Sequence, residues 1–141
     1  MAGTKVLVVE DEKIVSKDIQ LSLKKLGYQV VGTADTGEGA VQEALEKRPD
    51  LILMDIMLKG DMTGIDATEE IRKHMDVPVV YLTANTDGAT IQKAKETEPH
   101  GYIIKPFKEV DIHTTIEMAI YKHSKEAEVI KERDMLYNIA E

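Results

Sequence analysis

Three acidic residues stand directly after apolar runs, and their type suits metal and phosphoryl chemistry. Glu10 and Asp11 follow one such run, and Asp55 follows another. If these runs are neighbouring parallel strands, the three carboxylates meet at the carboxyl ends of the strands, where open α/β sheets bind ligands. Carboxylates that lie close together repel one another, and a hard divalent cation relieves that repulsion. We therefore predict a Mg²⁺ (or Mn²⁺) site on Glu10, Asp11 and Asp55, completed by the backbone carbonyl of Met57.

Asp55 carries more weight in this prediction than the acidic pair does. Capping of the next helix is an alternative explanation for Glu10 and Asp11, because carboxylates are favourable at helix N-termini. It explains Asp55 poorly, since that residue lies inside the stretch Leu-Ile-Leu-Met-Asp-Ile-Met-Leu. An unpaired charge in such a stretch is costly unless something binds it.

Two further apolar runs end in residues that suit a phosphoryl group. Val-Val-Tyr-Leu-Thr ends in Thr83, which is followed by the small Ala84, and Tyr-Ile-Ile-Lys ends in Lys105. At the same rim as the carboxylates, Thr83 would hydrogen-bond a phosphoryl group on Asp55 and Lys105 would supply a point charge. Each residue is ordinary alone, and the prediction rests on their conjunction.

Short apolar runs alternate with helical patterns, which predicts an α/β fold with a parallel sheet. The expected strands are residues 5–9, 29–33, 51–54, 77–83 and 102–104. Continuously apolar runs are typical of central strands that are covered on both faces. We expect a doubly wound, five-stranded parallel sheet in the order 2-1-3-4-5, with helices on both faces.

The first helix is expected to bury a broad apolar face and to end at Gly27, and Thr36 is expected to cap the second helix. The apolar face of the first helix is expected to comprise Ile14, Ile19, Leu23 and Leu26.

The last helical pattern is unusually long. It contains no Gly or Pro from about Glu109 to Glu141, whereas a helix in a globular domain usually spans three or four turns. Its early apolar positions give it a docking face, and beyond His123 it is mostly charged. A solvated tail and a projecting connector helix, with at most weak coiled-coil character, remain alternatives. We expect a domain over 1–122 and a helical linker over 123–141 that leads to an output domain.

Composition excludes several classes of protein. The chain has 141 residues, a formal net charge of −8 and no cysteine. Its length favours one domain, its negative charge argues against nucleic-acid binding, and disulfides, thiolate zinc sites and cysteine nucleophiles are excluded. No apolar stretch is long enough for a signal peptide or a membrane span, so a cytoplasmic location is expected.

The chain resembles the receiver domain of response regulators in two-component signalling. The resemblance covers about residues 4–122 and implies a flavodoxin-like fold. It rests on Val-Leu-Val-Val-Glu-Asp-Glu at 6–12, Leu-Ile-Leu-Met-Asp-Ile at 51–56, Gly64, Pro-Val-Val-Tyr-Leu-Thr-Ala at 78–84 and Gly-Tyr-Ile-Ile-Lys-Pro-Phe at 101–107.

The resemblance implies a role for each residue of the site. Asp55 would accept a phosphoryl group from a phosphohistidine on a sensor histidine kinase or phosphotransfer protein. Glu10 and Asp11 would hold Mg²⁺, while Thr83 and Lys105 would contact the phosphoryl group.

The resemblance also implies a switch and a readout. Thr83 and Tyr102 match the switch positions, although packing of an edge aromatic on the sheet is an alternative role for Tyr102. Lys105 and Pro106 match a cis peptide bond. The surface of the fourth helix, fifth strand and fifth helix would then change and bind a partner or a second copy, with the C-terminal helix as another dimer contact.

The sequence departs from the commonest receiver pattern at several points. The loop 56–64 is one residue longer, and Glu10 replaces an aspartate. Met57 and Asn85 occupy positions that tune water access, from which we expect slow-to-moderate self-dephosphorylation. The tail resembles that of receivers at the N-terminus of multidomain sensors.

Three rival functions fit less well. An aspartate-nucleophile phosphatase needs an acid two residues after Asp55, where Met57 stands. A flavin module needs Ser, Thr and Gly after the first strand, where Glu-Asp-Glu would repel a phosphate. A pseudo-receiver that only binds partners does not need the full set of acidic, Thr and Lys residues. We therefore expect a phospho-acceptor and not an enzyme acting on other substrates.

Overall fold

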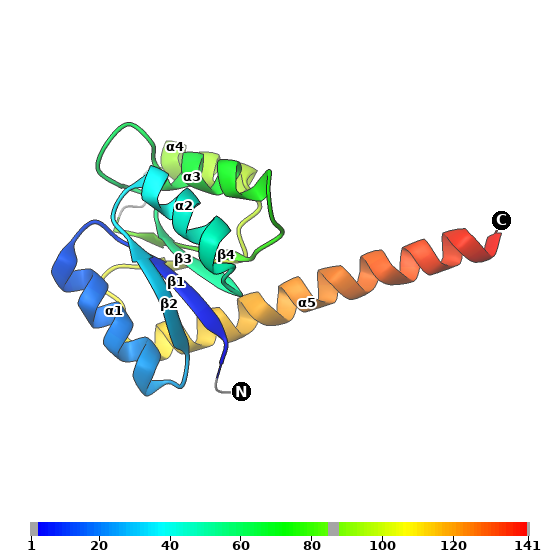
Figure 1. Cartoon of the computed structure of the whole chain (residues 1–141), viewed down its shortest axis with the longest axis horizontal. Coiled ribbons are helices and arrows are strands. Elements are labelled where there is room, and N and C mark those ends of the chain that lie inside the picture. The colour runs from blue at the N-terminus through cyan, green and yellow to red at the C-terminus, as the bar shows by residue number, and fades with distance from the viewer. Residues whose placement is uncertain (1–2, 85–87, 141) are drawn as a thin grey trace.

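In the described part of the chain, which comprises residues 3–84 and 88–140 with backbone alone for 137–140, five parallel strands form one sheet in the order β2-β1-β3-β4-β5. This computed structural model confirms the predicted fold class and strand order (Figure 1). The strands are β1 (Lys5–Val9), β2 (Gln29–Ala34), β3 (Leu51–Asp55), β4 (Val79–Thr83) and β5 (Gly101–Ile104). The helices are α1 (Lys13–Lys25), α2 (Gly37–Lys47), α3 (Gly64–Arg72), α4 (Gly88–Glu96) and α5 (Glu109–Ala140).

The sheet separates two apolar cores. Helices α2, α3 and α4 cover one face, and α1 and α5 cover the other. Alternate residues of a strand point to opposite faces, so the central strands contribute side chains to both cores. The first core takes Leu7, Val9, Ile52 and Met54, and the second takes Val6, Val8, Leu51 and Leu53. Burial on both sides explains why β1 and β3 are continuously apolar.

Local signals set where the helices begin and end. The side chain of Thr36 accepts a hydrogen bond from the amide of Gly39 at 3.0 Å, which confirms the predicted N-cap of α2. Helix α1 ends one residue earlier than predicted. Leu26 is its C-cap and Gly27 follows with φ of +93°, a conformation that glycine adopts readily.

Two expectations about the elements were wrong. Ile14 does not belong to the buried face of α1, because its side chain is 80% exposed. It stands five residues before the buried Ile19, which rotates it by about 140° away from that residue on a helix with 3.6 residues per turn. Strand β4 begins at Val79 and not at Val77, since Pro78 has no amide hydrogen for the ladder.

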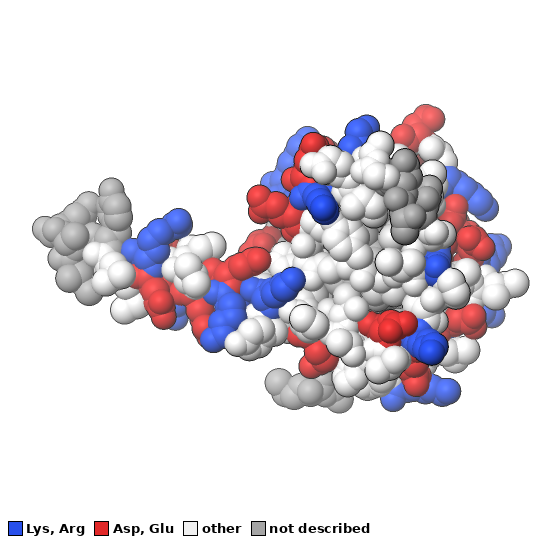
Figure 2. All heavy atoms as spheres, turned by 180° about the vertical axis from the view of Figure 1, so that it is seen from behind, with Lys and Arg blue, Asp and Glu red and all other residues white. Residues whose placement is uncertain are grey.

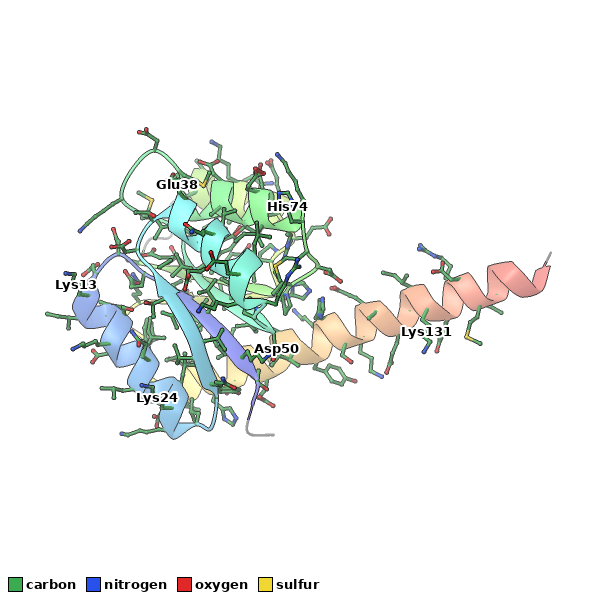
Figure 3. The ribbon with its side chains drawn as sticks, in the orientation of Figure 1. Lys13, Lys24, Glu38, Asp50, His74 and Lys131 are labelled. Carbon is green, nitrogen blue, oxygen red and sulfur yellow. The ribbon has the colours of Figure 1, made fainter. Side chains whose placement is uncertain are left out.

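Helix α5 leaves the body of the protein after docking on it (Figure 1). Ile112, Ile116 and Ala119 are buried against the sheet. Every side chain from 124 to 136 is exposed, and Lys131 lies on this projecting part (Figure 3). Among the described residues, no helix combines the length and hydropathy that a bilayer crossing requires.

Two histidines fix the point at which α5 leaves the body. The buried His100 contacts Glu126 of α5 through its Nε2 atom at 3.0 Å, and Nε2 of His123 lies 3.2 Å from a carboxylate oxygen of Asp76. The two imidazole rings meet edge to face with centroids 5.5 Å apart. We call these four side chains the histidine joint.

Candidate functional site

Glu10, Asp11 and Asp55 come together at the carboxyl ends of β1 and β3. Val9 pairs with Met54 in the parallel register, so the residues that follow them are neighbours. One carboxylate oxygen of each residue lies within 4.8 Å of the others. Glu10 and Asp55 are buried, and Asp11 is half-buried. The structure therefore gathers the three carboxylates that the sequence singled out.

Lys105 joins this cluster from the end of β5. Its ammonium lies 2.7 Å from Oε1 of Glu10 and 3.2 Å from Oδ2 of Asp55. Burial alone would lower the pKa of Lys105, but the hydrogen bond to Glu10 and the charge of Asp55 outweigh it and leave that pKa raised. Lys105 is thus a firmly held cation that bridges two of the carboxylates. The sequence suggested its place at the site but not its closer contact with Glu10.

The carboxylate cluster suits a hard divalent cation. Burial raises the pKa of Glu10, and its hydrogen bond with Asp55 raises it further, although Lys105 acts in the opposite direction. One ammonium does not offset three carboxylates, so added positive charge would favour the ionised form of Glu10. Carboxylate oxygens are the ligands that Mg²⁺ prefers in proteins.

The loop after β3 holds the Asp55 carboxylate in place. The amide of Met57 donates a hydrogen bond to Oδ1 of Asp55 at 3.1 Å, and the Met57 side chain is 66% exposed. The loop also contacts the N-cap of α2 through a bridge between Lys59 and Thr36. Asp55 therefore has a fixed orientation, with Oδ1 on Met57 and Oδ2 on Lys105.

Thr83 ends β4 on the same rim and is buried. The amide of Lys105 donates to the carbonyl of Thr83 at 2.8 Å, which ties the ends of β4 and β5 together. Ala84 follows as an exposed residue. Asn85, which the sequence linked to the phosphoryl lifetime, lies outside the described residues. The Lys105–Pro106 peptide bond is cis.

Tyr102 is half-buried and packs against the core on the side of the sheet that α2, α3 and α4 cover. Its hydroxyl is buried, and among the described residues it has no hydrogen-bond partner. Burial raises the pKa of Tyr102. The ring thus occupies an inward position while its polar end is unsatisfied.

Gly64 has a steric role that the sequence did not explain. A Cβ atom at this position would overlap the backbone carbonyl oxygen of Asp55. Glycine therefore lets the start of α3 pass directly behind the Asp55 backbone. The side chain of Thr63 caps α3 at this point, in a capping box with Asp66.

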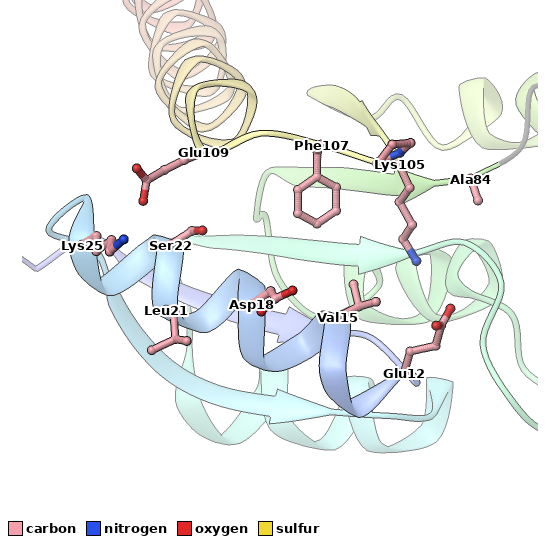
Figure 4. Close-up of a pocket in the computed structure, with 11 residues that line it drawn as sticks. Glu12, Val15, Asp18, Leu21, Ser22, Lys25, Ala84, Lys105, Phe107 and Glu109 are labelled. Carbon is pink, nitrogen blue, oxygen red and sulfur yellow. The ribbon is translucent and has the colours of Figure 1, made fainter.

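A cavity of about 700 Å³ opens beside the site, between α1 and the segment that follows β5. Figure 4 shows Phe107 and Val15 on its opposite walls, with Lys105 and Ala84 toward one end. Leu21 of α1 adds an exposed apolar side chain to the lining. The cavity places apolar surface next to the ammonium of Lys105.

The fold and this site define a receiver domain. Residues 6–117 match the response regulator receiver domain, and the chain belongs to that family. It is therefore a signalling domain of the two-component type, a class that is generally not enzymatic and that binds Mg²⁺ in its active site.

Individual relatives are similar over most of this chain. Transcriptional regulatory protein PdtaR of Mycobacterium tuberculosis is 35% identical over 116 residues, which cover 82% of this chain and 56% of that protein. The signal receiver domain of a modulated diguanylate cyclase from Desulfovibrio desulfuricans is 38% identical, with a TM-score of 0.82 and coverage of 86% and 97% of the two chains. The receiver domain of a sensor histidine kinase from Pseudomonas aeruginosa has magnesium coordinated in its active site cleft. It is 34% identical, with a TM-score of 0.77 and coverage of 84% and 98%.

The curated relatives are longer proteins. This chain spans about half of their length, with 56% of PdtaR and 44% of the regulator PhyR of Methylorubrum extorquens covered.

Proposed function

We propose that this chain is a phosphorylation-driven switch in which Asp55 accepts a phosphoryl group from a phosphohistidine, with Glu10, Asp11 and Asp55 holding Mg²⁺. The observation that carries the proposal is the convergence of three carboxylate oxygens within 4.8 Å beside the ammonium of Lys105. The magnesium ion in the cleft of the related histidine-kinase receiver supports the same assignment.

The proposed transfer forms one bond and breaks one. An oxygen of Asp55 bonds to phosphorus while the bond from phosphorus to the donor histidine nitrogen breaks, and the electron pair stays on that nitrogen. The Met57 amide and Lys105 orient the Asp55 carboxylate for the attack. Glu10, Asp11, Asp55 and the Met57 carbonyl would hold Mg²⁺, which when bound would supply positive charge to the phosphoryl oxygens. Lys105 and the hydroxyl of Thr83 then contact those oxygens, next to Ala84.

Access of water to the phosphorylated Asp55 would set the lifetime of the signal. Met57 stands two residues after the acceptor, and its side chain is exposed. A flexible apolar side chain offers no group that activates water, which supports slow-to-moderate self-dephosphorylation. A measured half-life of a few seconds would contradict this expectation.

The signal would be read on the face formed by α4, β5 and α5. Phosphorylation adds roughly two negative charges, and Thr83 moves toward them. The preferred rotamer of the Tyr102 side chain then changes. Exposed apolar side chains at Ile104, Val110 and Met118 give this region contact surface. Figure 2 shows few charged side chains over the centre of the body on the side that it presents.

The proposed partners are a sensor histidine kinase or phosphotransfer protein as donor, and a second copy or an output module as receiver of the signal. A second copy could also pack along the projecting part of α5, which exposes Val129, Ile130 and Leu136. Acidic and basic side chains alternate along this part of the helix (Figure 2), so like-charge repulsion does not prevent pairing.

Incubation with acetyl phosphate and Mg²⁺, followed by intact mass measurement, tests the proposal. Wild type should gain one phosphoryl group, and Asp55→Ala should gain none because the acceptor oxygen is gone. Asp61→Ala, which removes an exposed carboxylate from the loop after β3, is the matched control and should be phosphorylated like wild type. No adduct on wild type, or an undiminished one on Asp55→Ala, would favour a pseudo-receiver that acts only by binding.

A further inference from the structure

Tyr81 connects the switch residues to the interior of the protein. It is fully buried in β4, two residues before Thr83, so both side chains point to the same face of the sheet. It pairs with Tyr102 in the register of β4 and β5. The centroids of the two rings lie 6.2 Å apart. A change in the position of Tyr102 therefore reaches Tyr81 by direct packing.

The hydroxyl of Tyr81 reaches the end of α4. It lies 2.7 Å from Oγ1 of Thr97, and the Thr97 hydroxyl donates to the carbonyl of Ala94 at 2.6 Å. A threonine hydroxyl has a single hydrogen. Because that hydrogen is used on Ala94, the Tyr81 hydroxyl is the donor in its bond to Thr97. The same hydroxyl also interacts with the side chain of Thr68 on α3. The bond is directional and runs from the sheet to the C-terminal turn of α4.

Arg72 fixes the same turn from outside. This residue ends α3, and its guanidinium donates to the backbone carbonyls of Thr97 and Glu98. Carbonyls at the end of a helix lack partners within the helix, and a basic side chain satisfies them well. The C-terminal end of α4 is therefore held by one bond from β4 and by a cation from α3.

Tyr102 differs from Tyr81 in having no such bond. Its buried hydroxyl has no partner among the described residues, whereas that of Tyr81 is paired. A buried polar group without a partner costs free energy. The inward position of Tyr102 is therefore easily shifted, while Tyr81 keeps its contact with α4.

We infer that Tyr81 is a positioning residue of the switch, which passes the movement of Tyr102 to the C-terminal end of α4 through its hydrogen bond to Thr97. The inference rests on the proposed function, since it requires a phosphorylation signal at Asp55. Tyr81 touches neither the carboxylates nor the phosphoryl site in this role. It determines how α4 responds once the signal has formed.

Hydrogen exchange of peptides within residues 88–98, measured before and after phosphorylation with acetyl phosphate and Mg²⁺, tests the inference. Wild type should show a difference between the two states. Tyr81→Phe keeps the ring and loses the donor, so it should form the same adduct while most of that difference disappears. Loss of one buried hydrogen bond corresponds to roughly a fivefold change in a local opening equilibrium, which is well within reach of the measurement.

Two further variants guard against a trivial explanation. Thr97→Val removes the acceptor and should reproduce Tyr81→Phe, whereas Thr97→Ser keeps the hydroxyl and should behave like wild type. Tyr28→Phe is the matched control, because it removes a tyrosine hydroxyl that bonds Glu117 of α5 on the opposite face. It should lower overall stability and leave the phosphorylation response of α4 intact.

The outcomes separate the inference from the proposed function. An absent adduct on wild type overturns both. An adduct on every variant, with Tyr81→Phe and Thr97→Val responding like wild type, overturns the role of Tyr81 alone. An equal loss of response in Tyr28→Phe also overturns it, because the effect would then be general destabilisation.

Discussion

Asp11 is the most exposed of the three clustered carboxylates. We expect Asp11→Asn to weaken Mg²⁺ binding about tenfold or more, because it removes one charged oxygen ligand. Mg²⁺ should raise the unfolding temperature of wild type by mass action, and that rise should largely vanish in the variant.

The same variant should behave in the opposite way without metal. In chelator-treated buffer, Asp11→Asn should unfold at or above the wild-type temperature, because repulsion with Glu10 and Asp55 is reduced. Asp61→Asn removes an exposed charge outside the cluster and should retain the full Mg²⁺ effect. Equal Mg²⁺ shifts in Asp11→Asn and wild type would rule out a metal at these carboxylates.

The ionisation of Tyr28 should make the folded state less stable at alkaline pH. Burial raises the pKa of Tyr28, and the carboxylate of Glu117 raises it further. The unfolded chain ionises its tyrosines near pH 10, so the folded state holds more protons above that pH. The stability that Tyr28 contributes is thus complete below pH 10 and is lost as the pH rises beyond it.

Tyr28→Phe should therefore cost stability at pH 8, where the bond to Glu117 is intact, and cost less at pH 10.5. The urea unfolding midpoints of the variant and of wild type are measured at both pH values. The difference between them should be smaller at pH 10.5 than at pH 8. If the difference between the two midpoints is the same at both pH values, Tyr28 ionises alike in the folded and unfolded chains.

Residue types predicted much of the candidate site. Glu10, Asp11 and Asp55 stood out because charges at the ends of apolar runs need an explanation, and parallel strands bring such ends together. Contacts between distant side chains were not predictable in this way. The bond of Tyr81 to Thr97 depends on where the end of α4 lies in space, and no spacing in the sequence records it.

At the scale of elements, Gly64 shows how closely α3 follows the site. We expect Gly64→Ala to destabilise the protein by about 3 kcal/mol or more, because the new Cβ overlaps the Asp55 backbone and neither chain segment is free to yield. The free energy of urea unfolding measures the loss. Phosphorylation of Asp55 should fail in the same variant.

Gly88, the first residue of α4, is the matched control. A Cβ there meets no atom within 4 Å. Gly88→Ala should therefore be neutral or stabilising by up to about 1 kcal/mol, since alanine loses less backbone entropy in a helix. Equal losses in both glycine variants would contradict the steric role assigned to Gly64.

Periodicity predicted the elements well and their surfaces less well. The order of strands and helices followed from the alternation of patterns, and Thr36 marked a helix start because its side chain replaces a missing backbone partner. Ile14 shows the limit of this approach. A hydrophobic residue in the first turn of α1 looks like core until the rotation of the helix is known, and it is in fact exposed.

For the whole molecule, the histidine joint brings Glu126 of α5 into contact with the body, while the domain boundary at 122 stays a prediction. A chain ending at 127 should match the full chain in stability within about 0.5 kcal/mol, because the removed side chains that are described are all exposed. Thermal and urea unfolding of the two chains give this comparison.

A chain ending at 121 should be less stable by about 1 kcal/mol, because it lacks His123 and Glu126 and leaves the buried His100 without its carboxylate. Identical stability of the chains ending at 121 and 127 would show that the joint does not hold the helix.

The exposed part of α5 beyond the histidine joint projects from the body as a rigid arm. From Glu126 to Ala140 the helix extends about 21 Å at 1.5 Å per residue. With its fulcrum at the joint, a tilt of about 10° carries the far end sideways by about 4 Å over that length. A small tilt at the joint would thus be enlarged into a clear displacement at the far end of the helix.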